Sequence, residues 1–270
     1  MKKTGICFLL MVACGFTPAG GNQHVSATGL FSEQELLSLA AEQYQQVLSS
    51  SQPPDPSEKD AQMLQEIAGK VNTAIGNYYT QRKQLSVLKS YTWESRLVNK
   101  KFINAFSLPG GRTIIGTGML DWAQSNSALA VVYAHQLAHV LLGHGEQRLK
   151  TALQELMGNK KLSELLTGAR ASDAKDVFMA AYGAGANVGL LPPFSRDQEI
   201  EADRLAMVFT AMAGYNPRET IVFWERMGKL ANGPRQPVLV TVHPAPAERI
   251  AKMQEEVEGL IRKYYAAKTG

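Results

Sequence analysis

Two histidines four residues apart, His135 and His139, are spaced to bind one metal ion. They lie in residues 127–147, SALAVVYAHQLAHVLLGHGEQ, an apolar stretch without proline that predicts a buried helix with Asn126 or Ser127 as its N-cap. Residues i and i+4 project from the same face of a helix. Two imidazoles placed in this way can share one Zn²⁺ at about 2.0–2.1 Å each.

Gln136 stands between them, so the string is HQxxH where zinc peptidases have HExxH. In that motif the Glu takes a proton from the attacking water. An amide can hydrogen-bond the water but cannot accept a proton near neutral pH. Losing a general acid–base group costs about 10²–10⁴-fold in rate, roughly 3–5 kcal/mol in barrier. We therefore expect an intact metal site with little or no proteolysis.

A zinc site of this kind needs a third protein ligand, and Glu199 is the best candidate. It lies one turn into a helix that Ser195 opens with capping-box spacing. Asp203 lies on the same helix face, where it is placed to accept the second N–H of a ligating histidine. Glu201 projects to another side and is the weaker choice. An isolated HxxxH pair is more often core packing, but the acidic turn on a second helix favours metal.

Helices dominate the elements that must position these side chains. Short β-like segments precede the histidine-bearing helix, and a Pro109-Gly110-Gly111 turn joins two of them as a hairpin. The scheme is α+β, mainly helical. Helices are predicted at about 32–49, 58–85, 127–147, 146–166 and 246–265, with two more starting near 195 and 216; strands are predicted within 91–98, 101–108, 112–120 and 238–242.

Three further features carry less chemistry. Gly183, Gly185 and Gly189 have GxGxxxG spacing and follow no strand, so close helix packing explains them better than a nucleotide loop. His144 lies off the ligand face and is expected at a helix end, where it would compensate the dipole. His24 has no assigned role.

Residues 1–19 have the basic start and short apolar run of an export signal. Residues 11–14 resemble the lipobox of bacterial lipoproteins, in which Cys14 becomes the lipidated first residue, and Gly15 after it favours the outer membrane. The alternative is ordinary cleavage near Ala19. Because Cys7 and Cys14 are the only cysteines, no internal disulfide can form in the mature chain.

The remaining chain divides at a Pro-rich stretch, residues 49–57. Residues 20–57 are predicted as a tether and an N-terminal helix, and residues 58–270 as the main domain. The net charge of +4 includes two lysines of the leader, and no dense Lys/Arg run follows. This charge pattern argues against a nucleic-acid partner.

Four strings together resemble the conserved blocks of metallopeptidase family forty-eight, which includes the CaaX prenyl proteases and the HtpX membrane proteases. The resemblance implies a zincin-type (gluzincin) catalytic domain with a small β-sheet and an active-site helix. It also implies that Glu199 is the third zinc ligand and that Asp203 orients a ligand histidine. The strings are NAFSLPGG (104–111), HQLAHVLLGHG (135–145), SRDQEIEADRLA (195–206) and HPAPAERI (243–250).

The resemblance gives roles to two further places. His243 falls where the family has a histidine that stabilises the oxyanion or occupies the water position, although a histidine before proline can also simply be exposed. Arg249 is expected to anchor that loop. Asn104, Ala105 and Phe106 fall in a strand, residues 101–108, along which an extended peptide would add by β-pairing. An ordinary sheet strand is the other interpretation.

The function that follows is that of a zinc-dependent metalloendopeptidase, attenuated by Gln136. Since no apolar stretch after the leader can span a bilayer, the chain is similar to the family's soluble periplasmic lipoproteins. It would then act on unfolded or misassembled polypeptides at the outer membrane, held by a lipid on Cys14. The alternatives are a non-catalytic, zinc-binding peptide binder or chaperone, and a helical envelope protein without metal.

Overall fold

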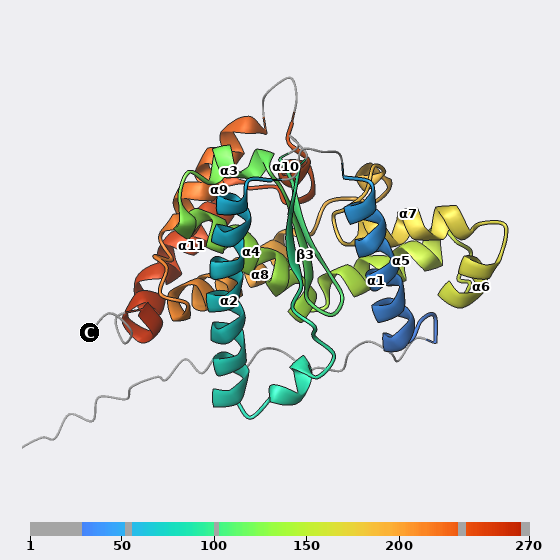
Figure 1. Cartoon of the computed structure of the whole chain (residues 1–270), viewed down its shortest axis with the longest axis horizontal. Coiled ribbons are helices and arrows are strands. Elements are labelled where there is room, and N and C mark those ends of the chain that lie inside the picture. Colours follow the sequence, from blue (N-terminus) through green and yellow to red (C-terminus); the bar gives the residue numbers. More distant parts are fainter. Residues whose placement is uncertain (1–28, 52–55, 100–102, 232–235, 266–270) are drawn as a thin grey trace, which may run out of the picture.

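The long helix α4 (Asn126–Leu141) and a three-stranded sheet lie at the centre of the fold, and the other helices surround them (Figure 1). The computed structural model describes residues 29–51, 56–99, 103–231 and 236–265. The predicted leader with Cys14, and His24 in the predicted tether, lie outside these residues. Within them, the prediction of a mainly helical α+β fold is confirmed.

The sheet has the strand order β1-β3-β2, so β2 is an edge strand. β2 (Ala105–Leu108) and β3 (Arg112–Gly116) form the predicted antiparallel hairpin, and β1 (Ser95–Val98) pairs with β3 in parallel. Gly110 and Gly111 in the turn have φ of 82° and 81°, which glycine adopts without strain. In Figure 1 the sheet stands between α2 on one side and α1 on the other.

Eleven α-helices are present in the described residues, and several begin at the predicted caps. Ser32 opens α1 and Ser195 opens α8, each with both hydrogen bonds of a capping box. The N-cap of α4 is Ser125, which accepts from the amide of Ala128, and not Asn126 or Ser127 as predicted. The other bounds are α1 (Glu33–Ser49), α2 (Glu58–Gln81), α3 (Gly118–Ala123), α5 (His144–Glu155), α6 (Leu162–Thr167), α7 (Ala171–Ala181), α8 (Arg196–Met212), α9 (Glu219–Leu230), α10 (Val238–Val242) and α11 (Ala247–Leu260).

Three predicted elements are wrong. The helix predicted over 127–147 ends at Leu141, because Gly143 takes a positive φ of 73° and α5 starts in a new direction. The continuous helix over 146–166 is broken into α5 and α6, because Gly158 and Asn159 both take positive φ between them. Val238–Val242, predicted as a strand from its β-branched residues, is the short helix α10. Its apolar side chains are buried among helices and β-propensity depends on a pleated neighbour to pack on, so tertiary contacts override the local preference.

Helix α4 is buried along almost its whole length, and every residue from Ala128 to Leu141 is shielded from solvent. One apolar cluster joins it to α2, α8, α9 and α11, and a second cluster unites α1, β2, β3 and α5 to α7. A helix that is apolar all round must be covered on every side. Its two histidines and its glutamine are therefore held by close packing from several elements.

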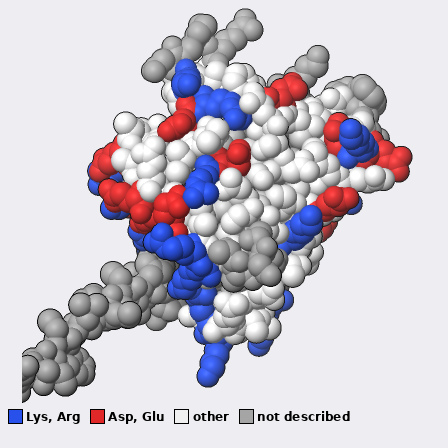
Figure 2. All heavy atoms as spheres, turned by 90° about the vertical axis from the view of Figure 1, so that its left-hand side faces the viewer, with Lys and Arg blue, Asp and Glu red and all other residues white. Residues whose placement is uncertain are grey.

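The surface carries charges of both signs. On the face shown in Figure 2, acidic and basic side chains form mixed groups, and large uncharged areas lie between these groups. Two of the ion pairs in the structure, Arg204 with Glu256 and Arg218 with Glu258, join the α8–α9 region to α11. None of the helices in the described part of the chain combines the length and hydropathy needed to cross a bilayer.

Candidate metal centre

Helices α4, α8 and α10 bring the candidate ligands together. His135 and His139 lie on the face of α4 that packs along α8. The capping box of Ser195 fixes the start of α8, and this places Glu199 in its first turn with the carboxylate buried. His243 directly follows α10, where its amide donates to the carbonyl of Leu239.

Four ligand atoms, one from each of these side chains, lie within 4.8 Å of one another. The Nε2 atoms of His135 and His139 are 3.0 Å apart, and His243 Nδ1 lies 3.2 Å from His135 Nε2. Glu199 Oε1 is 2.8 Å from His243 Nδ1 and 3.4 Å from His139 Nε2. Tetrahedral ligands at about 2.0–2.1 Å from zinc are roughly 3.3 Å apart, so this set of atoms fits one ion.

Burial keeps two of the imidazoles neutral, as metal binding requires. It lowers the pKa of His243 to about 4 and the pKa of His139 well below its usual range. Burial alone would raise the pKa of Glu199, but Arg249 and the neighbouring imidazoles hold it well below its ordinary value. Burial would also lower the pKa of His135, but the carboxylates of Asp203 and Glu199 beside the ring outweigh burial and raise that pKa. The buried carboxylates thus favour a positive charge at this point, whether a proton or a metal ion.

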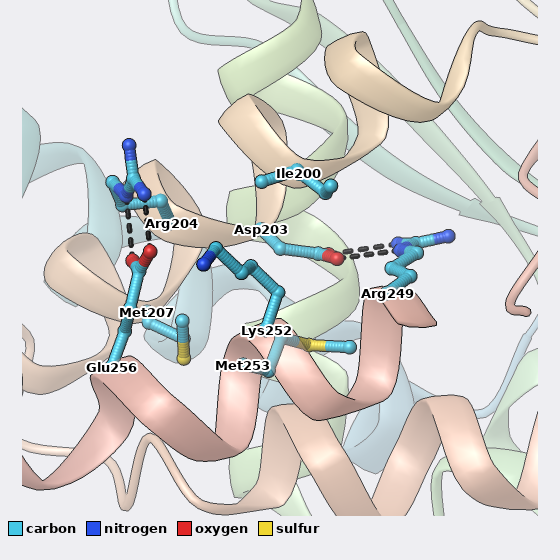
Figure 3. A pocket seen from close by; sticks show the side chains of 8 residues that line it. All are labelled: Ile200, Asp203, Arg204, Met207, Arg249, Lys252, Met253 and Glu256. Atoms are coloured by element: carbon cyan, nitrogen blue, oxygen red, sulfur yellow. Dashed lines mark hydrogen bonds and ion pairs between the residues drawn. The ribbon is translucent and has the colours of Figure 1, made fainter. Parts of the chain in front are cut away.

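Asp203 and Arg249 support the centre from behind. Asp203 Oδ1 lies 3.0 Å from Nδ1 of His135, on the side of the ring that faces away from the other ligand atoms, and this leaves Nε2 for a metal. Arg249 approaches both oxygens of Asp203, at 2.5 and 2.8 Å, as Figure 3 shows. It also lies 2.6 Å from Glu199 Oε2 and donates to the carbonyl of Pro244 at 2.9 Å. Arg249 therefore contacts the loop after His243 and also neutralises buried carboxylates.

Gln136 and His243 contact each other at the edge of the centre. The amide nitrogen of Gln136 is placed 3.3 Å from His243 Nε2, and both residues are buried. If His243 ligates through Nδ1, its Nε2 carries a proton, and the Gln136 amide turned about its axis presents its oxygen to accept that proton. The ring of Phe194 stacks on His243 with centroids 5.0 Å apart. The alternative of an exposed His243 is wrong for this structure, because the residue is buried.

His144 is not where the sequence placed it. It is the first residue of α5, so it lies at a helix N-terminus, where a cation would not compensate the dipole. Its Nδ1 lies 3.0 Å from Nδ1 of His139, and its Nε2 lies 3.3 Å from a carboxylate oxygen of Glu201. Glu201 thus contacts His144 and makes no contact with the four ligand atoms that the structure describes. The α-helical period could not reveal this contact, since His139 and His144 belong to different helices.

The predicted substrate strand is buried. Ala105 and Phe106 open edge strand β2, and Asn104 precedes it. The Asn104 side chain donates to the carbonyl of Gly183 at 3.3 Å. A Cβ built on Gly183 would lie 2.9 Å from a methyl of Val242 and 3.8 Å from His243 Nε2. The glycine of this segment therefore permits close packing beside the centre, in agreement with the packing interpretation.

Fold and centre together define the class of protein. Two histidines one turn apart on a buried helix and a glutamate on a second helix, beside a small sheet, are the arrangement of a zincin-like metallopeptidase domain. The sequence profile of Peptidase family M48 matches residues 69–257. The chain belongs to this peptidase family, whose members are metal-dependent.

Known relatives agree with this assignment. The chain is 30% identical over 190 residues to the mitochondrial metalloendopeptidase OMA1 of Arabidopsis thaliana, covering 68% of this chain and 37% of that protein. It is 30% identical over 178 residues to OMA1 of Saccharomyces cerevisiae, covering 63% and 48%. It is 28% identical over 160 residues to the beta-barrel assembly-enhancing protease of Escherichia coli (strain K12), covering 57% and 32%. The matched part thus spans a third to a half of these relatives.

Proposed function

We propose that this protein is a zinc-dependent metalloendopeptidase of the bacterial cell envelope, acting on unfolded or misassembled proteins, and that Gln136 attenuates it. The convergence of His135 Nε2, His139 Nε2 and Glu199 Oε1 on one buried point carries the proposal, because this is the protein ligand set of a peptidase zinc site. The names of the relatives support it, since all three are proteases.

The chain's own residues are the reason for the low turnover that we propose. A divalent ion held by His135, His139 and Glu199 would supply Lewis acidity toward the scissile carbonyl and the attacking water. Gln136 can orient the attacking water but cannot take its proton. His243 Nδ1 lies in the fourth corner of the ligand set, where a substrate or a water would have to enter. We infer that His243 leaves this corner during turnover.

The segment from Asn104 to Phe106, at the start of β2, is the proposed place for substrate. β2 is a sheet edge, and an extended peptide can pair with such an edge through its backbone. Since β2 is fully buried here, the segment around Gly183 that contacts Asn104 must move aside first.

Restoring the carboxylate tests the proposal. Gln136→Glu should raise cleavage of an unfolded substrate such as casein by about 10²–10⁴-fold, and a chelator should abolish the gain. The matched control is Gln147→Glu, an exposed glutamine on α5, which should change nothing. Metal analysis should find about one zinc per chain in wild type and in Gln136→Glu, and none in His135→Ala.

A non-catalytic peptide binder is the second candidate. The observation that favours it is the pair formed by Gln136 and His243, which leaves the centre without a general base and with its fourth corner occupied. If Gln136→Glu keeps its zinc and still cleaves nothing, the binder is the better account. If wild type takes up no metal, both proposals are wrong.

We further propose export by the leader and attachment to the outer membrane through a lipid on Cys14. The polypeptide substrates would then be those that meet the periplasmic side of that membrane, and we propose no nucleic-acid partner. Radiolabelled palmitate should be incorporated into wild type and into Cys7→Ala but not into Cys14→Ala. Label in all three, or in none, would contradict the anchor.

A further inference from the structure

Each histidine of the pair on α4 turns one nitrogen to the centre and the other away from it. For His135 the outward nitrogen is Nδ1, and the buried carboxylate of Asp203 lies 3.0 Å from it. For His139 the outward Nδ1 lies 3.0 Å from Nδ1 of another histidine, His144. No carboxylate contacts His139 directly on this side among the described residues. The partner that fixes the first imidazole therefore has no direct equivalent at the second.

A carboxylate lies on the far side of His144, away from His139. His144 is buried, and its Nε2 lies 3.3 Å from Glu201 Oε2. The Glu201 side chain is 53% exposed, so it lies at the boundary of the centre with solvent. The His139 and His144 rings are 5.0 Å apart between centroids and inclined by 71°. His139, His144 and Glu201 thus form a chain of contacts from the centre to the surface.

Hydrogen-bond chemistry allows one arrangement of protons that satisfies every member of this chain. Two facing Nδ1 atoms must share one proton, because each neutral imidazole has one donor and one acceptor. If His139 donates it, the lone pair of His139 Nε2 faces the centre, and His144 carries its own proton on Nε2, directed at Glu201. In the reverse arrangement the lone pair of His144 Nε2 faces the carboxylate, so two acceptors oppose each other. Glu201 therefore selects the arrangement in which His139 can bind a cation.

We propose that His144 and Glu201 are positioning residues, which hold His139 in the tautomer and orientation that bind the metal ion. The proposal rests on the proposed metal site. It adds two residues to those that support the site, beyond Glu199 and Asp203 on α8. Helix α8 then supplies three carboxylates with separate tasks: Glu199 at the centre, Asp203 behind His135, and Glu201 behind His144.

The chain geometry explains how His144 reaches this place. α4 ends at Leu141, and Gly143 takes φ of 73°, which starts α5 in a new direction. His144 is the first residue of α5, so its ring returns to the outward side of His139. The turn, and not the helical period of α4, brings the two imidazoles into contact.

Zinc affinity, measured by competition with a chromophoric chelator, tests the proposal. Loss of an outer partner of a metal ligand typically weakens affinity about 10–100-fold. We expect Glu201→Ala and His144→Leu to weaken zinc binding within that range. His144→Asn should recover most of the loss, because its side-chain oxygen can accept from His139 Nδ1. Asp197→Ala removes an exposed carboxylate from the same helix and should leave the affinity unchanged.

Glu201→Ala is the decisive variant, since replacing an exposed side chain should not unfold the protein. Wild-type affinity in Glu201→Ala, or equal affinity in His144→Asn and His144→Leu, would overturn the proposal. Imidazole nitrogen NMR of the metal-free protein gives a second readout that needs no bound zinc. It should find His139 protonated on Nδ1 and His144 on Nε2. Protonation of His144 on Nδ1 would overturn the proposal, whether or not wild type binds metal. Failure of wild type to bind metal is a separate result, which would refute the proposed function.

Discussion

Replacing Arg249 by alanine should destabilise the protein far more than removing any ion pair at the surface. Its guanidinium is 1% exposed, and it neutralises Asp203 and Glu199, which are equally buried. It also lies over the ring of Trp224, 4.0 Å from its centroid. Breaking a buried pair by removing one partner leaves an uncompensated charge and costs about 3–5 kcal/mol.

Arg204 provides a matched control at the same interface, because it directly follows Asp203 on α8 and its partner Glu256 lies about two turns beyond Arg249 on α11. It pairs with Glu256 across α8 and α11, the two helices that Arg249 and Asp203 also join, as Figure 3 shows. Its side chain is 30% exposed and that of Glu256 is 22% exposed, so water can solvate the Glu256 carboxylate that remains after Arg204 is truncated. Pairs near the surface contribute about 0.2–1 kcal/mol, and Arg204→Ala should cost no more than that.

The assay is denaturant and thermal unfolding in excess chelator, so that loss of metal does not enter the comparison. For a domain of this size each kcal/mol shifts the melting temperature by about 2–4 °C. We therefore expect a decrease of about 6–20 °C for Arg249→Ala and of at most about 4 °C for Arg204→Ala. Equal decreases in the two variants would refute the assignment of this energy to buried charge.

The difference in unfolding free energy between wild type and Arg249→Ala should depend on pH, and this dependence also tests whether buried charge is the cause. Burial alone would raise the pKa of Asp203, but Arg249 holds it below its ordinary value, and the pKa of Glu199 is lowered in the same way. The wild-type protein consequently loses stability as pH falls below about 5, when the unfolded chain gains protons that the folded carboxylates do not. In Arg249→Ala these carboxylates can protonate in the folded state. The difference in unfolding free energy should therefore be smaller at pH 4 than at pH 7.

Two further predictions concern the core. Burial raises the pKa of Tyr44 and of Tyr133 to about 12, so stability should be full below about pH 10 and fall between pH 10 and 12 as the unfolded chain ionises. The phenolate absorbance that wild type loses in Tyr44→Phe or Tyr133→Phe reports these two rings, and its appearance before unfolding would contradict this. Gly145→Ala should destabilise the protein by about 1–3 kcal/mol, because the new Cβ would lie 2.3 Å from the buried ring of Tyr182. Gly69→Ala in α2 should stabilise it by about 0.5–1 kcal/mol, because the new Cβ meets nothing within 4 Å. Urea unfolding of the two glycine variants measures both, and equal effects would contradict the packing argument.

Local patterns predicted the elements that supply the ligands. The spacing of His135 and His139 places both on one face of a helix whatever surrounds it, and the Ser195 capping box fixes the turn that carries Glu199. The Pro109-Gly110-Gly111 string made the hairpin between β2 and β3 predictable in the same way, since glycine adopts without strain the positive φ that both positions take. In each case the determining interactions join residues a few positions apart, so the sequence contains them directly.

The sequence was a poor guide where packing decides. Val238–Val242 has the composition of a strand and forms α10, because its apolar side chains are buried among helices and not on a pleated surface. The break at Gly158 and Asn159 was missed because isolated Gly and Asn are also tolerated inside helices.

The amino-acid sequence by itself determined that α4 and α8 form, that these two helices carry imidazole and carboxylate ligands, and that Gln136 removes the proton acceptor. Only the tertiary structure decided that His243 Nδ1 occupies the fourth corner, that Arg249 compensates two buried carboxylates, and that His144 links His139 to Glu201. The physical reason is the separation along the chain of the residues that interact. Helical period and capping act between neighbours in the chain, whereas these three contacts join groups on separate elements and exist only once α4, α5, α8 and α11 have packed together.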